Sequence, residues 1–328
     1  MAVLNKPEPT PFSLLQKKGC LHLSFNSLGT SCEVIIASCS GSTAEEIARY
    51  LISWVVDFEQ RYSRFRADSW ISKINQSAGN ERVSIEKKDE EILNAAISTY
   101  FLSRHAIDPS CLPLSLLWQK AKQEKKLPSE REITQAKNLT GWQRVEFGIG
   151  QIRLPTKGMG LDFGGFGKEF AVDKVSEILR KQNLENFLIN FGGDIYASGR
   201  ASDGGGWRVG IEKNDQDSKP RFILELENQA LASSGSYRKY FDYGDRRYGH
   251  VIDPRTGYPT IHSDLISSVI SSSCLKAGVL ATSCLLHGKL WGFDNLQATW
   301  DTEGCIQSLD SCSITNNFYK YAIYENLD

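Results

Sequence analysis

The chain has 328 residues, 41% of them hydrophobic and 23% charged, a composition typical of a globular protein with a buried core and not of a disordered one. Its 38 basic residues nearly cancel its 39 acidic residues, and no Lys/Arg run forms a local patch, which argues against nucleic acid as a partner. The eight cysteines show neither a C-x-x-C pair nor metal-ligand spacing, so we expect reduced core residues.

The amino-terminal half predicts strands followed by helices. Residues 1–19 are polar and contain proline, which predicts a flexible arm. Apolar residues alternate over 21–25 and 31–37, which predicts two strands. Helical spacing of apolar residues then predicts one helix from Ser42 to Phe58 and another from Lys87 to His105.

The first residues contain no apolar segment of a signal peptide and no cysteine placed for lipid attachment. Elsewhere, no apolar run approaches the ~20 residues that are needed to span a bilayer. We therefore expect a cytoplasmic protein without a membrane anchor.

The second half interleaves short strands with amphipathic helices. Residues 121–140 are charged and predict a surface excursion. Beyond it we expect a helix over 165–181 and four strands, over 151–154, 186–191, 207–212 and 222–226. This order indicates an α+β or α/β protein rather than a sandwich or a helix bundle.

A glycine cluster stands where a predicted strand gives way to a helix. Gly164, Gly165 and Gly167 lie between Asp162 and Lys168, so backbone amides can approach a ligand and a lysine follows one turn later. The amino-terminal end of a helix attracts anions, and phosphate is the natural guest. The alternative from these residues alone is a tight strand-to-helix turn without a ligand.

A second segment reads as a strand that enters a proline-containing turn. Asp253-Pro254 favours the start of a turn, and Gly257 can adopt a positive φ. His250 then lies at the strand end, where a neutral imidazole can accept a proton or orient a phosphate. Taken alone, a single histidine is more often structural.

Both segments resemble the FAD:protein FMN transferase family (ApbE-like). Residues 162–173 follow its Asp-x-Gly-Gly-x-Ala-Lys-Gly-x-Ala-x-Asp pattern, with Gly167 for the alanine and Glu169 for the second glycine. Residues 250–259 match every fixed position of its His-x-Ile-Asp-Pro-x-Thr-Gly-x-Pro signature. Weaker matches make the resemblance continuous over about residues 20–290, at 28–30, 62–75, 106–109, 190–195 and 232–241.

The resemblance implies an α+β, ApbE-like (T-fold-related) architecture in two parts, with mixed sheets and flanking helices. On this basis residues 20–145 are the amino-terminal part and 146–290 the core FAD-binding part. Residues 291–328 are expected to be a carboxyl-terminal extension.

The family's reaction breaks the FAD pyrophosphate, attaches FMN to a hydroxyl of a target protein and releases AMP. The resemblance therefore implies FAD as substrate, magnesium as cofactor and a flavoprotein acceptor that presents a Thr or Ser, and it leaves a homodimer open. It places His250 and Asp253 near the reacting phosphate. The residues implied as FAD contacts are Leu28, Phe65, Ala106, Ile107, Asp108, Asp162, Lys168 and Ile252.

The implied magnesium ligands are Thr282 and the Gly165 carbonyl, together with an aspartate that this chain lacks. The family's Ala-Asp-x-x-Ala-Thr element is here Ala-Gly-Val-Leu-Ala-Thr, with Gly278 at the position of the acid. Since magnesium prefers oxygen ligands that include a carboxylate, the site should be weakened, or water and the FAD phosphates complete the shell. A further alternative is that another acid, such as Asp253 or Asp162, replaces the missing one.

Two alternatives to the transferase remain open at this point. Water could replace the hydroxyl acceptor, which would make the protein a metal-dependent FAD pyrophosphatase. The missing acid could also leave a catalytically silent FAD-binding protein. The other histidines have no partner spacing and are expected to be structural or on the surface; they are His22, His105, His262 and His287.

Overall fold

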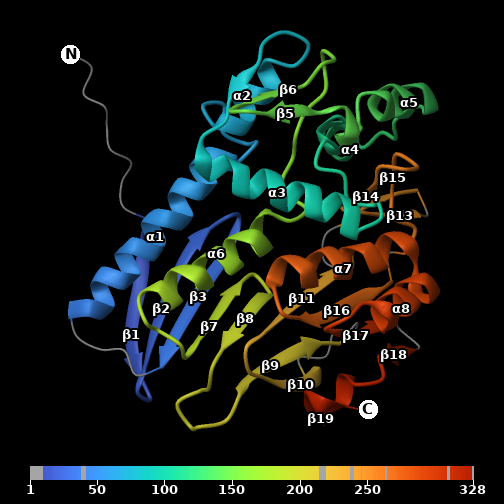
Figure 1. Cartoon of the computed structure of the whole chain (residues 1–328). Helices are drawn as coiled ribbons and strands as arrows, with labels where there is room; N and C mark the ends of the chain where they lie inside the picture. Colours follow the sequence, from blue (N-terminus) through green and yellow to red (C-terminus); the bar gives the residue numbers. More distant parts are fainter. Residues whose placement is uncertain are drawn as a thin grey trace, which may run out of the picture.

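The computed structural model describes residues 10–37, 42–213, 219–236, 240–244, 246–262, 264–308 and 311–326. Within them, nine strands form one large sheet in the order β1-β2-β3-β7-β8-β11-β16-β17-β18 (Figure 1). Their bounds are Phe12–Lys17, Cys20–Ser27, Thr30–Ala37, Phe187–Phe191, Asp194–Ser198, Gln229–Gly235, Ile266–Ser271, Thr302–Gln307 and Cys312–Ile314. The predicted α+β class is confirmed.

The large sheet joins the parts of the chain that the resemblance had separated. Strands β1 to β3 precede residue 145 and the other six strands follow it. The two parts expected at 20–145 and 146–290 therefore share one sheet. Mixed sheets were expected, but the ladders between the described strands are antiparallel. Antiparallel strands can be joined by a short hairpin, as β2 and β3 are between Ser27 and Thr30. Part of the expected arm is wrong, because Phe12–Lys17 pairs with β2 as strand β1; residues 1–9 lie outside the described residues.

Helices cover one face of this sheet, and α6 and α7 lie side by side over its middle (Figure 1). Alternate residues of β7, Phe187, Ile189 and Phe191, share a buried cluster with these helices. No helix in the described ranges is long and apolar enough to cross a bilayer. The helices, α1 to α8 in order, are Ser42–Tyr62, Trp70–Gln76, Lys87–Leu102, Leu112–Glu124, Glu130–Asn138, Gly167–Lys181, Cys274–His287 and Lys289–Ala298, with 3-10 turns at Trp142–Arg144 and Phe318–Lys320.

A small sheet covers the opposite face. Strands β9 (Trp207–Glu212), β10 (Pro220–Leu226) and β19 (Ala322–Glu325) bury Phe222 and Leu224 against residues of the large sheet. The buried partners include Ile195, Leu231 and Ile270, which explains why β8 is buried on both of its sides.

Shorter elements complete the fold around the site. Ser129 and Glu132 form a capping box that starts α5, so the expected surface excursion over 121–140 is mostly exposed and consists of the end of α4 and a second helix. In Figure 1 this pair lies beside β14 and β15. The remaining strands are β4 (Val83–Ser84), β5 (Glu146–Gly148), β6 (Gln151–Arg153), β12 (Tyr240–Tyr243), β13 (Arg246–Gly249), β14 (Ile252–Asp253) and β15 (Tyr258–Pro259).

A buried ion pair joins α1 to α3. Arg61 donates from Nε and Nη2 to the two oxygens of Asp89, at 2.6 and 2.7 Å. The Tyr62 hydroxyl and the Glu86 amide donate to the same carboxylate, at 2.8 Å each. Burial alone would raise the pKa of Asp89, but these four donors together lower it, so the group is held as a carboxylate.

We expect Asp89→Ala to lower the free energy of unfolding by about 1.5–3 kcal/mol, because Arg61 and the Tyr62 hydroxyl lose their buried acceptor while Arg61 keeps its exposed partner Glu86. Urea denaturation of the whole chain measures this value. The matched control is Asp68→Ala, which removes an exposed partner of Arg66 and should cost less than about 1 kcal/mol. Equal losses in the two variants would contradict a special role of the buried pair.

Candidate functional site

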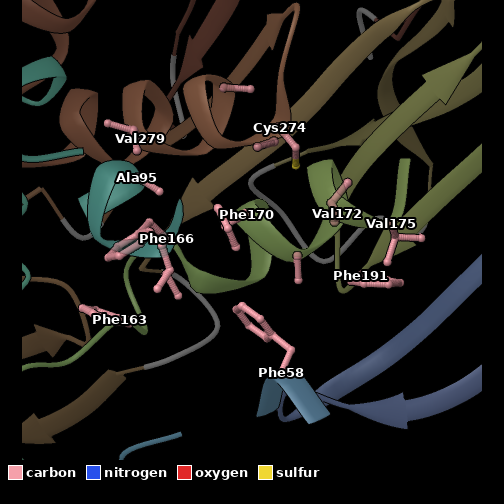
Figure 2. Packing of buried hydrophobic residues seen from close by; sticks show 14 of the residues in the cluster. Phe58, Ala95, Phe163, Phe166, Phe170, Val172, Val175, Phe191, Cys274 and Val279 are labelled. Carbon is pink, nitrogen blue, oxygen red and sulfur yellow. The ribbon is translucent and has the colours of Figure 1, made fainter. Parts of the chain in front are cut away.

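Buried aromatic rings fix the backbone of the glycine cluster. Phe163 and Phe166 are buried, with ring centroids 5.2 Å apart, and Phe170 stacks on Phe58 of α1 at 5.8 Å. Figure 2 shows these rings within the buried cluster beneath the helices. Between the two anchored rings, Gly164 and Gly165 are exposed. The hydrophobic residues of the motif therefore present its glycine backbone to solvent.

Asp162 lies in a loop and not at the junction of a strand and a helix. Strand β6 ends at Arg153 and α6 begins at Gly167. The loop between them contacts the segment that joins α3 to α4, at Pro109. One oxygen of Asp162 accepts the Gly164 amide at 2.9 Å, and the other pairs with Arg64 at 2.8 Å. Sequence reasoning missed Arg64, although it stands inside the segment 62–75 that was singled out.

Phe65, the residue chosen from that segment, is 76% exposed, and the Arg64 guanidinium lies 4.1 Å from its ring centre. The arginine thus holds Asp162 on one side and Phe65 on the other. A contact between Phe65 and a nucleotide stays a prediction.

The predicted contact residues 106–108 run alongside the glycine cluster. The Asp162 amide donates to the Pro109 carbonyl at 2.8 Å, and a Cβ added to Gly165 would lie 3.3 Å from Ile107. Ala106 is fully buried. Asp108 is also buried and accepts hydrogen bonds from the Ser110 amide in its own loop at 2.7 Å and from the Trp142 amide of the following 3-10 turn at 3.1 Å. These side chains brace the glycine turn, and their contact with a nucleotide remains untested.

Lys168 forms an ion pair with Asp194 at the start of β8. Burial would lower the pKa of Lys168, but Glu169 and Asp194 outweigh it and raise that pKa, so the lysine stays charged. Asp194 follows the tight turn of Gly192 and Gly193, both with positive φ. Asp194 was not predicted as a site residue, although its Asn-x-Gly-Gly-Asp turn was noticed.

The turn of Leu28 and Gly29 lies beside the turn before Asp194. The Gly192 amide donates to the Ser31 carbonyl at 3.1 Å. Leu28 has a φ of 55°, and its amide donates at 3.0 Å to Glu59 of α1, which fixes this turn. The structure therefore brings segments 28–30, 106–109, 162–168 and 190–194 together around the amino-terminal end of α6.

Glu169 occupies the place of the missing side chain at position 278. A Cβ added to Gly278 would lie 2.5 Å from Glu169 Cγ and 2.8 Å from its Oε1. Glu169 is buried, and burial with the neighbouring Asp194 raises its pKa to about 8. One turn further along α7, the Thr282 hydroxyl donates to Ser234 Oγ at 3.1 Å. Two of the predicted metal positions thus lie on α7: Gly278 packs against the first turn of α6, and Thr282 lies one turn further along α7, against Ser234 of β11.

An arginine clamps the histidine turn to the end of α7. Arg255 donates to both oxygens of Asp253, at 2.9 and 2.8 Å, and to the Leu286 carbonyl at 2.9 Å. The same guanidinium lies 2.7 Å from Nδ1 of His287, whose ring stacks on Trp291. Since Asp253 is saturated by Arg255, it positions the turn; sequence reasoning had not given Arg255 a role.

His250 is exposed and lies next to Gly249, where a Cβ would come within 2.6 Å of Ser236 Oγ. Because Ser236 follows Ser234 in the chain, this contact places the histidine turn near Thr282 on the same side of the sheet. Ile252 packs with Trp118 and Ile133 of the α4–α5 pair, an arrangement that no local pattern revealed. It is only partly buried there, and its contact with a nucleotide stays a prediction.

The two acids that could have replaced the missing aspartate are both engaged. Asp162 is paired with Arg64 and Asp253 with Arg255. Within the described residues, no group of three or more His, Cys, Asp or Glu side chains is placed to hold a metal. A cation here would need hydroxyl, phosphate and water oxygens beside a single carboxylate, which suits magnesium.

The sequence model described as "ApbE family" matches residues 28–305. The chain belongs to the ApbE family. The FAD:protein FMN transferase of Vibrio cholerae is 28% identical over 287 residues, covering 84% of this chain and 86% of that protein. The protein of the same name from Haemophilus influenzae is 28% identical over 286 residues, covering 82% and 81%.

Solved structures agree with the fold of this ApbE family member. A mutant of flavin transferase ApbE from Vibrio cholerae superposes with a TM-score of 0.81 at 25% identity, covering 92% of this chain and 99% of that one. The ApbE protein of Thermotoga maritima gives a TM-score of 0.83 at 24% identity, covering 93% and 100%. The family resemblance read from the motifs is confirmed.

We expect Arg255→Gln to lower the free energy of unfolding by about 1–3 kcal/mol, because the buried Asp253 carboxylate loses two donors. Replacing Asp253 by Asn in the same chain should restore part of this loss, since no unpaired charge remains. Urea denaturation of the two variants measures both values. Arg200→Gln, which removes an exposed pair with Glu227, serves as the control and should change stability by less than about 1 kcal/mol.

Proposed function

We propose that this protein is an FAD:protein FMN transferase, which moves FMN from FAD to a Thr or Ser hydroxyl of a flavoprotein and releases AMP. Family membership and the names of the curated relatives support this activity. The observation that carries it in this chain is the exposed glycine turn at the amino-terminal end of α6, with the charged Lys168 beside it. Such a turn suits the diphosphate of FAD.

The reaction replaces the phosphoanhydride bond of FAD by a phosphate ester to the acceptor hydroxyl. The acceptor oxygen forms a bond to the FMN phosphorus, the P–O bond to AMP breaks, and AMP leaves with the bridging oxygen. The hydroxyl proton needs an acceptor, and we assign this role to His250, which is exposed to solvent. Asp253 accepts hydrogen bonds from Arg255 and so fixes the conformation of the histidine turn. We therefore assign it a positioning role for His250.

Negative charge accumulates on the oxygens around phosphorus in the transition state, so fixed positive charge and aimed amides provide the main stabilisation. Lys168 and the amides of the glycine turn are placed for this in our proposal. Bound magnesium would add Lewis-acid stabilisation of the same oxygens. Thr282 and the Gly165 carbonyl remain proposed ligands.

We also propose that the protein acts in the cytoplasm. The seven cysteines within the described residues are free, and five of them are buried, which fits a reducing environment. The acceptor flavoprotein would then be reached in that compartment.

The decisive assay combines the protein with FAD, magnesium and a flavoprotein domain, and follows the acceptor by intact mass and AMP by chromatography. We expect an acceptor mass increased by one FMN and an equal amount of AMP. AMP without modified acceptor would indicate the pyrophosphatase instead. Bound FAD without AMP would indicate a silent flavin-binding protein.

Lys168→Met should reduce kcat/KM for FAD about 10²–10³-fold, because it removes a fixed cation from the phosphate site. Steady-state AMP release measures this change, with the thermal unfolding midpoint recorded to show that the variant is folded. Lys181→Met, at the exposed carboxyl-terminal end of the same helix, is the control and should leave the rate unchanged. A folded Lys168 variant with the wild-type rate would contradict the role of this lysine.

A further inference from the structure

The first turn of α6 carries a carboxylate without a counterpart in the family pattern. Glu169 stands where that pattern has glycine, and its residue is only 8% exposed. Its Oε2 is buried and has no hydrogen-bond partner among the residues that the structure describes. A buried carboxylate oxygen without a partner destabilises the folded protein unless a cation or a hydrogen-bond donor binds it.

Gly278 is the residue that makes room for this side chain. Besides the contacts to Cγ and Oε1, a Cβ on Gly278 would lie 3.0 Å from Glu169 Cδ. Gly278 lies within α7, where glycine costs about 1 kcal/mol relative to alanine, so a packing reason is needed for it. The acid of α6 supplies that reason, because it fills the volume of the absent side chain.

The surroundings of Glu169 favour a divalent cation. Asp194 adds a second carboxylate and Lys168 a single positive charge, so the three groups carry a net negative charge when ionised. The hydroxyl of Thr282 lies on the same helix as Gly278, one turn later. Glu169 therefore lies beside Gly278, one helical turn of α7 before Thr282, and interacts electrostatically with the pair of Lys168 and Asp194.

We propose that Glu169 provides the metal-binding carboxylate of this protein from α6, in place of the acid that its family pattern has at position 278 on α7. This proposal concerns the cation of the proposed transferase site and rests on that function for its purpose. The family pattern has glycine at position 169 and aspartate at position 278, and this chain has Glu169 and Gly278. In this proposal the carboxylate stays at the same place in the site, but α6 carries it instead of α7.

The test measures binding of Mn²⁺ alone by electron paramagnetic resonance, without flavin or acceptor. Glu169→Gln keeps the shape of the side chain and should weaken Mn²⁺ binding at least tenfold. Gly278→Asp alone should lower stability, because its Cβ meets Glu169. Combining Glu169→Gly with Gly278→Asp restores the family arrangement and should recover both stability and Mn²⁺ binding.

Asp173→Asn is the matched control, because Asp173 is a largely buried carboxylate on the same helix that accepts the Cys274 and Leu275 amides. It should change the unfolding midpoint and leave Mn²⁺ affinity unchanged. Wild-type Mn²⁺ affinity in Glu169→Gln, or no recovery in the folded double variant, would overturn the proposal. Loss of Mn²⁺ binding in Glu169→Gln without any FMN transfer by the wild type would support the metal site and count against the transferase only.

Discussion

Burial of the rings of Phe163 and Phe166 is the constraint on which the site depends. The two rings pack into the main core, and the backbone between them must turn outwards. Gly164 and Gly165 occupy that outward turn and carry no side chain that would cover the amides. The hydrophobic effect, acting on two phenylalanines, thus fixes the direction of backbone dipoles several residues away.

Paired charges flank this turn and are held before any ligand arrives. Asp162 is joined to Arg64 and Lys168 to Asp194, and the histidine turn has its own pair, Asp253 with Arg255. Each pair connects segments distant in sequence or fixes a tight turn, so the electrostatic field of the site is set by the fold. Groups fixed in this way need little reorganisation when charge develops on a bound phosphate.

Sequence patterns were sufficient for the elements whose signal is local. The helix α6 has Val172, Val175 and Leu179 at helical spacing, all of them buried, and the motifs at 162–168 and 250–257 identified the family. The covering of Ile252 by α4 and α5 could not be predicted, because it depends on packing between segments more than a hundred residues apart. Arg64 was missed for the same reason, since its partner Asp162 is distant in sequence. Arg255 has a local partner in Asp253, but its contact with Leu286 depends on tertiary structure.

The exchange between Glu169 and Gly278 also restricts the order in which this site can have changed. From the family pattern, glutamate gained first at 169 would meet the side chain still present at 278, because the helices leave room for one of them. Loss of the acid at 278 first creates no collision and leaves only a vacant volume. An ancestor with glycine at both positions, folded but poor in metal affinity, is therefore the accessible intermediate between the two arrangements.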